Sequence, residues 1–372
     1  MTTEIRSHLW ARGLAATVLF IATASACNAE LSTNATVFAT GLNNPRGLKF
    51  GPGGALYVAE GGVGGGNSTV GQCDQVRSPV GPYTGSDSGS RISKIDSHGT
   101  RSTVVDNLPS SQTAAGVGGF VSGVGDIAFV GNKLYAVLAG AGCSHGVADI
   151  PNGVLQVNRD GGTTQLADLS AFQQANPVAN SEEDDFEPDG TWYSMVALGS
   201  TLYALEPNHG ELDKITRDGQ ISRVIDISAS QGHVVPTAMV FHGGSFYVGT
   251  LMPFPASTTA KVYRITRKGA ISVVAEGLTT VVGLAFQGSL LYVLETSAPV
   301  TSPGPPVLPG TGQVVRVQKS GALEPVVTGL TFPTAMTFGH DGKLYISNFG
   351  FGFPAGSGEV VRADLGKGSG RH

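Results

Sequence analysis

The sequence predicts an all-β fold: a six-bladed β-propeller with four antiparallel strands per blade, in which an N-terminal strand closes the last blade. The main observation is a Leu-Tyr-Val-like triplet that follows short Gly-centred turns and recurs at residues 56–58, 134–136, 202–204, 246–248, 291–293 and 344–346. β-patterned units that recur in this way are typical of propellers and solenoids, because one unit cannot bury its apolar face alone. The composition agrees, since 54 Gly and 20 Pro among 372 residues favour many short strands joined by turns.

Each unit is predicted to contain four strands, and the third unit shows them most compactly. Apolar and polar positions alternate over residues 192–198, 201–206, 211–215 and 221–226. Turns such as Arg217-Asp-Gly219 and His340-Asp-Gly342 provide the positive φ that tight hairpins require.

The two ends of the chain are predicted to share one blade. The last unit has three strands, the third of them at residues 358–362, and no fourth. Residues 34–42 have no unit of their own, yet they resemble residues 324–330, the fourth strand of the fifth unit. Pairing of the N-terminal strand with the last unit would complete six blades and remove an open sheet edge.

The N-terminus has the parts of a secretory signal peptide over residues 1–26. Arg6 and Arg12 precede an apolar run, which ends in Ala24-Ser-Ala26. We therefore expect a secreted or periplasmic protein without an integral membrane span, a propeller over residues 27–364 and a polar C-terminal tail over residues 365–372. Cleavage after Ala26 would leave Cys27 first, so a lipid anchor at this residue is an alternative.

Charge and cysteine content limit the partners. A net charge of −5 makes nucleic acid an unfavourable partner. We expect a monomer, and we expect its partner to be a small molecule or a glycan. Cys73 and Cys143 lie in Gly-rich excursions of neighbouring units. An oxidising compartment would let them form a disulfide, and two unpaired thiols are the alternative.

The long loops are predicted to lie on one face of the ring. In a four-stranded blade, the link between the second and third strands and the crossover to the next blade open on the same face. The long segments all fall in these connections, namely residues 60–88, 106–123, 139–152, 168–191, 250–260, 296–312 and 349–357. Long loops on a rigid scaffold often bind ligands, so we expect the ligand at this loop-rich face. The alternative is that these loops only cap the channel.

Oxygen-bearing side chains end the second strand of four units. They occur three residues after the triplet tyrosine, at Glu60, Glu206, Glu295 and Asn348. If they converge at the channel mouth, three carboxylates and an amide suit Ca²⁺. The alternative is separate hydrogen-bonded strand ends.

Two charged residues are expected near the channel. Most innermost strands carry Gly, Ala or Ser before their central apolar position, whereas the second unit carries Asp126 there. A channel-facing carboxylate is a candidate proton acceptor, and a satisfied buried Asp is the alternative. Arg46 would be its counter-charge or would hold an anionic ligand.

The segment Glu206-Pro-Asn-His-Gly-Glu211 is the densest polar cluster. His209 is a second catalytic candidate, as a general base, although Asn and His before Gly also form plain turns. His145 and His233 fall on the same face, and the acidic run at residues 181–190 is expected to be solvated. The residues expected to bind ligand are Arg46, Glu60, Asp126, Tyr193, Glu206, Asn208, His209, Glu211, Glu295 and Asn348.

Several motifs resemble those of the ScyD/ScyE family. They are Gly41-Leu-Asn-Asn-Pro-Arg-Gly-Leu48, Leu56-Tyr-Val-Ala-Glu-Gly-Gly62, Val235-Pro-Thr-Ala-Met239, Phe246-Tyr-Val-Gly-Thr250, Gly312-Gln-Val-Val-Arg316 and Tyr345-Ile-Ser-Asn-Phe-Gly350. The resemblance spans roughly residues 35–364 and implies an exported propeller without naming a substrate. More distantly, the blades are similar to NHL repeats and to gluconolactonase-like propellers, which implies a central Ca²⁺ that holds a substrate oxygen.

Three functions follow from these observations. The first is an exported propeller that binds a small molecule or glycan at the loop-rich channel mouth. The second is a Ca²⁺-assisted lactonase or esterase-type hydrolase, with His209 or Asp126 as proton acceptor. The third is a protein-interaction scaffold, which Phe254, Phe349, Phe351 and Phe353 would favour if they form an apolar patch.

Overall fold

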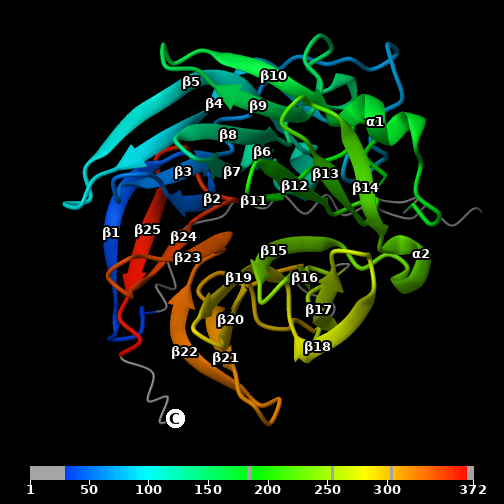
Figure 1. The fold of residues 1–372 in the computed structure, drawn as a ribbon. Coiled ribbons are helices and arrows are strands. Elements are labelled where there is room, and N and C mark those ends of the chain that lie inside the picture. The colour runs from blue at the N-terminus through cyan, green and yellow to red at the C-terminus, as the bar shows by residue number, and fades with distance from the viewer. Residues whose placement is uncertain (1–29, 182–185, 253–254, 302–304, 367–372) are drawn as a thin grey trace, which may run out of the picture.

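The computed structural model describes residues 30–181, 186–252, 255–301 and 305–366 and confirms the six-bladed β-propeller (Figure 1). The six sheets follow one another around a central channel. The predicted signal peptide, Cys27, Phe254 and most of the C-terminal tail lie outside the described residues. No helix in the described ranges is long and apolar enough to cross a membrane.

Each blade is an antiparallel sheet whose first strand lies at the channel, and the bounds of the strands are as follows. Blade 1 contains β2 (Pro45–Phe50), β3 (Leu56–Glu60), β4 (Thr84–Ile95), β5 (Arg101–Gln112) and a short additional strand, β6 (Val121–Ser122). Blade 2 contains β7 (Val124–Val130), β8 (Lys133–Leu138), β9 (Gly153–Val157) and β10 (Thr163–Asp168). Blade 3 contains β11 (Ser194–Leu198), β12 (Thr201–Glu206), β13 (Glu211–Ile215) and β14 (Ile221–Asp226).

The remaining blades follow the same order. Blade 4 contains β15 (Pro236–His242), β16 (Ser245–Thr250), β17 (Ala260–Thr266) and β18 (Ile271–Leu278). Blade 5 contains β19 (Val281–Gln287), β20 (Leu290–Glu295), β21 (Gly312–Val317) and β22 (Leu323–Leu330). Blade 6 contains β23 (Ala335–Phe338), β24 (Leu344–Asn348) and β25 (Gly358–Ala363), and β1 (Ala35–Leu42) completes it.

The N-terminal strand closes the ring as the sequence predicted. Strand β1 pairs antiparallel with β25, from Ala35 opposite Ala363 to Leu42 opposite Gly358. In Figure 1 the blue β1 lies beside the red β25. The closure joins the two ends of the propeller by backbone hydrogen bonds.

The recurring triplet encodes contacts between neighbouring blades. Its first residue is buried in every blade, as the 1% exposure of Leu56 and the 0% exposure of Leu344 show. In four blades its tyrosine meets an aromatic ring on the innermost strand of the next blade, edge to face and with ring centroids 4.8 to 5.3 Å apart. These pairs are Tyr57–Phe129, Tyr247–Phe286, Tyr292–Phe338 and Tyr345–Phe50. The repeat therefore stabilises the ring as well as each blade.

Short turns and long loops separate to opposite faces. The loop-rich face carries the helices α1 (Leu169–Ala175) and α2 (Ser228–Gln231) and the 3₁₀ turns η1 (Ala115–Val117) and η2 (Cys143–His145). Asp168 caps α1 by accepting a hydrogen bond from Ala171 N. In the described residues, the opposite face carries the short hairpin turns, and we call it the turn face.

Candidate functional site

The four residues predicted as metal ligands each bind the backbone of their own blade. The side-chain oxygens of Glu60, Glu206, Glu295 and Asn348 accept hydrogen bonds from Asn43 N, Thr191 N, Thr279 N and Thr331 N, at 2.6, 2.9, 2.6 and 2.8 Å. Each donor lies on the crossover that enters the same blade. In these four blades, the residue at the end of the second strand thus holds this crossover in place by a hydrogen bond. We call these four residues the crossover clips.

The oxygens of the clips are already occupied, so they do not fit a Ca²⁺ site. In Glu60 one oxygen accepts from Ser93 Oγ and the other from Arg91 Nε at 2.9 Å. In Glu295 the second oxygen accepts from Gln313 Nε2 at 2.8 Å. The four side chains do not converge, and no group of three or more His, Cys, Asp or Glu in the described ranges has a geometry that would hold a metal ion. The structure corresponds to the alternative of separate hydrogen-bonded strand ends.

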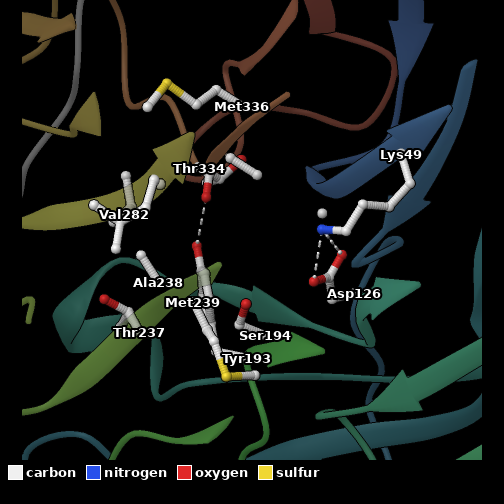
Figure 2. Close-up of a pocket in the computed structure, with 14 residues that line it drawn as sticks. Lys49, Asp126, Tyr193, Ser194, Thr237, Ala238, Met239, Val282, Thr334 and Met336 are labelled. Carbon is white, nitrogen blue, oxygen red and sulfur yellow. Dashed lines mark hydrogen bonds and ion pairs between the residues drawn. The ribbon is translucent and has the colours of Figure 1, made fainter. Parts of the chain in front are cut away.

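Asp126 lies in the channel and is fully paired. Both of its oxygens accept from Lys49 Nζ, at 3.1 and 3.2 Å, and they also accept from the backbone N–H groups of Ile127 and Met195, each at 2.9 Å (Figure 2). A Cβ at Gly47 would stand 1.8 Å from Asp126 Oδ1, so only glycine fits opposite this carboxylate. Asp126 is therefore the satisfied buried Asp of the alternative interpretation, and its counter-charge is Lys49.

The Tyr193 side chain lies across the channel, at the end that opens on the loop-rich face. It precedes the innermost strand of blade 3, and its hydroxyl donates to Thr334 O of blade 6, on the opposite side of the ring, at 3.4 Å (Figure 2). Burial raises the pKa of Tyr193, and the nearby Arg46 guanidinium opposes this shift. The remaining channel cavity, about 30 Å³, holds only one or two water molecules. A ligand on this face would therefore rest on Tyr193 outside the channel.

Arg46 lies beside Tyr193 and has no carboxylate partner among the residues that the structure describes. Its side chain donates to Val121 O and lies over the Tyr193 ring, with its Cζ 6.0 Å from the centroid. Only 8% of Arg46 is exposed, and within the described part of the chain no Asp or Glu lies within ion-pair distance of it. Because a buried guanidinium without a carboxylate partner among the described residues is costly, this group is the strongest candidate for an anion contact.

The segment from Glu206 to Glu211 is buried and does not line an open site. His209 is 5% exposed, its ring contacts Phe186, and its Nε2 lies 3.0 Å from Glu187 O. Asn208 is 8% exposed. Glu211 pairs with Arg223 and accepts from Gln173 Nε2 at 3.1 Å. These residues lie close together, but their side chains bind other parts of the chain and hold the loops of blade 3 in place.

Three carboxyl groups of blade 3 have raised pKa values. Burial is the largest cause for Glu206, Glu211 and Asp213. Repulsion from neighbouring carboxylates adds to the pKa shift of Glu206 and Asp213, whereas the Arg223 guanidinium opposes the shift of Glu211. Asp213 has the largest shift, although Trp192 Nε1 donates to its Oδ2 at 3.2 Å. These groups favour protonation in the folded state, and the sequence analysis did not single out Asp213.

The acidic run was expected to be solvated, and its described end is instead buried. Glu187 is 5% exposed and accepts from the Tyr83 hydroxyl at 2.7 Å, while its other oxygen lies 3.3 Å from His145 Nε2. The Ser111 Oγ lies 3.0 Å from His145 Nδ1. The side chains of Ser111, His145 and Glu187 contact one another in the order of a serine, histidine and acid catalytic triad. Ser111 and His145 are each 0% exposed, however, so a substrate could not reach them. The cluster therefore ties the loops of blades 1, 2 and 3 together.

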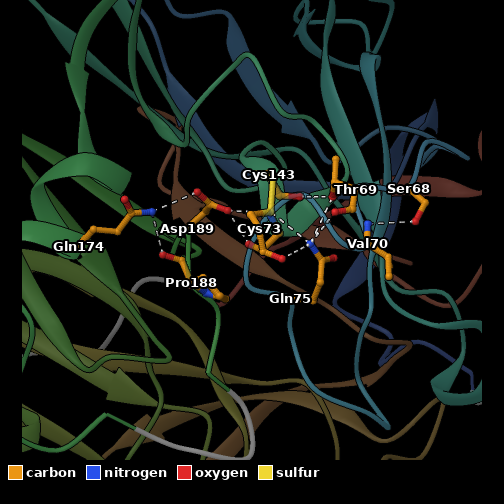
Figure 3. The surroundings of a disulfide bond; sticks show 10 residues. Ser68, Thr69, Val70, Cys73, Gln75, Cys143, Gln174, Pro188 and Asp189 are labelled. Atoms are coloured by element: carbon orange, nitrogen blue, oxygen red, sulfur yellow. Dashed lines mark hydrogen bonds between the residues drawn. A yellow bond between two sulfur atoms is a disulfide. The ribbon is translucent and has the colours of Figure 1, made fainter.

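A disulfide joins Cys73 to Cys143 next to this buried cluster. The Cα atoms are 6.3 Å apart, and 70 residues separate the two cysteines in the sequence. Around the bond, Thr69 Oγ1 donates to Cys143 O, and Gln174 Nε2 lies 3.4 Å from Asp189 Oδ1 (Figure 3). The bond fixes the excursion of blade 1 to that of blade 2.

Phenylalanines form a cluster on the loop-rich face, close to Arg46. Phe351 stacks on Phe332 with centroids 4.6 Å apart and meets Phe120 at 5.4 Å, while Phe353 contacts Phe349 at 4.8 Å. All five rings are partly exposed. Phe120 directly precedes Val121, whose carbonyl accepts from Arg46. An apolar surface thus adjoins the Arg46 guanidinium.

The comparisons with known proteins support the fold alone. No protein-family model and no curated protein sequence matches this chain. A protein of unknown function from Bacteroides thetaiotaomicron is similar in structure, with a TM-score of 0.55 and 10% identity over 90% of this chain and 76% of that chain. An auxiliary nutrient binding protein from the same organism has a TM-score of 0.54 and 9% identity over 90% and 76% of the two chains. A gluconolactonase from Xanthomonas campestris has a TM-score of 0.47 and 12% identity over 88% and 97%.

Proposed function

We propose that this protein is an exported, ScyD/ScyE-like propeller that binds an anionic small molecule or acidic glycan on its loop-rich face. Arg46 carries the proposal, because it is a buried guanidinium without a carboxylate partner in the described residues. Lys49 neutralises Asp126, so this carboxylate does not require Arg46. Of the two roles expected for Arg46, the Lys49–Asp126 pair supports the contact with a ligand anion.

The surroundings of Arg46 suit such a ligand. Tyr193 provides a flat floor, and the phenylalanine cluster provides an apolar wall for the uncharged part of the ligand. Export is supported by the signal-peptide pattern of residues 1–26 and by the Cys73–Cys143 disulfide, a bond that persists in oxidising compartments.

The alternatives have less support. The hydrolase needs Ca²⁺, and the predicted ligands already accept backbone hydrogen bonds as crossover clips. His209 and Asp126, its candidate proton acceptors, are buried and hydrogen-bonded. The interaction scaffold is supported by the phenylalanine cluster, which we assign to the wall of the ligand site.

Calorimetric titration of the mature protein with trigalacturonate and with inorganic phosphate tests the proposal. We expect both anions to bind, and Arg46→Gln to weaken trigalacturonate binding about tenfold or more, since a hydrogen bond to a charged group contributes about 1.5–3 kcal/mol. Arg217→Gln is the matched control, because it removes the same charge from an exposed turn on the opposite face. Absence of binding by both anions, or equal affinity in Arg46→Gln, would contradict the proposal.

A further inference from the structure

The turn face contains a larger cavity than the channel. Its volume is about 260 Å³, and it lies where the ring closes, between blades 1 and 6. Strands from both ends of the chain contribute to it, including β1 with Phe38 and β25 with Arg362. Arg46 does not line this cavity, because its side chain lies at the opposite, loop-rich face.

Aromatic rings form one wall of the cavity. Tyr345 meets Phe50 edge to face at 5.0 Å, as the triplet tyrosine does at other junctions, and the closing strand adds Phe38 at 5.2 Å. Leu56 and Ile95 lie at the base. Phe38 and Phe50 remain partly exposed, so their surfaces are accessible from the cavity.

Polar groups with unused hydrogen-bonding capacity surround this wall. The Oδ1 of Asp96 accepts from His98 N at 2.8 Å and from Thr100 N at 2.9 Å, which fixes the carboxylate. Its Oδ2 has no hydrogen-bond partner within the described ranges, and neither has the exposed hydroxyl of Ser97. The exposed ring of His340 lies 6.1 Å from Phe50, and Arg362 lies over Phe38 at 5.1 Å.

We propose that this cavity binds one neutral pyranose ring, such as a terminal sugar residue. The apolar C–H face of a pyranose fits an aromatic wall, and its hydroxyl groups fit an oriented carboxylate, an imidazole and a guanidinium. Asp96 and Asp341 exceed Arg362 by one negative charge, so the lining is weakly acidic and does not favour an anionic ligand. A mostly apolar pocket with a few oriented polar groups is the usual design of a small-molecule site.

Saturation-transfer-difference NMR with methyl β-D-glucopyranoside and methyl β-D-galactopyranoside tests this site. We expect transfer to the ring protons of at least one glycoside. Asp96→Asn keeps the oxygen that accepts the two turn N–H groups and replaces Oδ2 by a donor, so binding should weaken about tenfold. Phe50→Leu keeps an apolar side chain and removes the ring, and it should also reduce the transfer.

Two control variants separate this inference from the proposed function. Asp218→Asn changes another exposed turn of the same face and should leave glycoside binding unchanged. Arg46→Gln should also leave it unchanged, while it lowers trigalacturonate affinity. The inference is overturned if neither glycoside binds the wild-type protein, or if binding is the same in Asp96→Asn and Phe50→Leu.

Discussion

The two faces of the propeller use their polar side chains differently. On the loop-rich face, the crossover clips, His145, Glu187 and Glu211 are buried and bind other parts of the chain. On the turn face the connections are short, yet Asp96 and Ser97 keep hydrogen-bonding capacity beside an open cavity. The difference teaches that long loops need internal hydrogen-bond partners for their own buried polar groups. The length of a loop therefore does not indicate how many of its polar side chains are available to bind a ligand.

Arg46 is the exception on the loop-rich face. It is buried there as the crossover clips are, but no carboxylate of the described chain neutralises it. The carboxylates of this face are hydrogen-bonded or ion-paired, whereas Arg46 has hydrogen-bond partners but no carboxylate partner in the described residues. This contrast is the basis of the proposed function.

Of the predicted changes, removal of the disulfide on the loop-rich face should have the largest effect on stability. If the bond holds the excursions of the loop-rich face, the double variant Cys73→Ser/Cys143→Ser should lose about 4 kcal/mol of unfolding free energy, as loop closure over 70 residues predicts. Urea unfolding of the variant, and of the wild-type protein with and without reductant, measures this loss. An unchanged free energy would show that the loops hold their positions without the bond.

Changes in pH should affect the stability of two Asp→Asn variants with opposite signs, one inside blade 3 and one on the turn face. The pKa of Asp213 is raised well above 3.8 by burial, so the unfolded chain ionises first and stability falls as pH rises above this value. Asp213→Asn should therefore gain stability relative to wild type between acid and neutral pH. The pKa of Asp218 is lowered, chiefly by the Thr216 hydroxyl, so Asp218→Asn should lose stability at neutral pH, and the loss should vanish in acid. Thermal melting from pH 3 to pH 8 measures both trends, and trends of the same sign would contradict the assignment.

The sequence was sufficient for the fold because the fold is repeated. The triplet marks every blade, and the resemblance of residues 34–42 to a fourth strand predicts the closing pair of β1 and β25. The short strand β6 was not predicted, since two residues in a long crossover carry no periodicity.

The candidate site was less predictable because partners far apart in the sequence determine it. Glu60 and Glu295 recur at the same position of their units, so the sequence showed that they share a role. Whether their oxygens bind a metal or a backbone N–H depends on the path of the crossovers. Lys49 lies 77 residues from Asp126, and its place on an innermost strand was the one available signal. The sugar cavity combines residues from both ends of the propeller, which no local pattern reveals.

Hydrogen–deuterium exchange of the mature protein at saturating trigalacturonate tests the central claim most directly. The account predicts slower exchange in peptides that cover residues 43–48, 119–123 and 190–196, where Arg46, Val121 and Tyr193 lie, and no change at residues 95–100. It also predicts that Arg46→Gln abolishes this protection. Protection confined to the turn face, or equal protection in Arg46→Gln, would contradict the claim that Arg46 is the ligand contact of the loop-rich face.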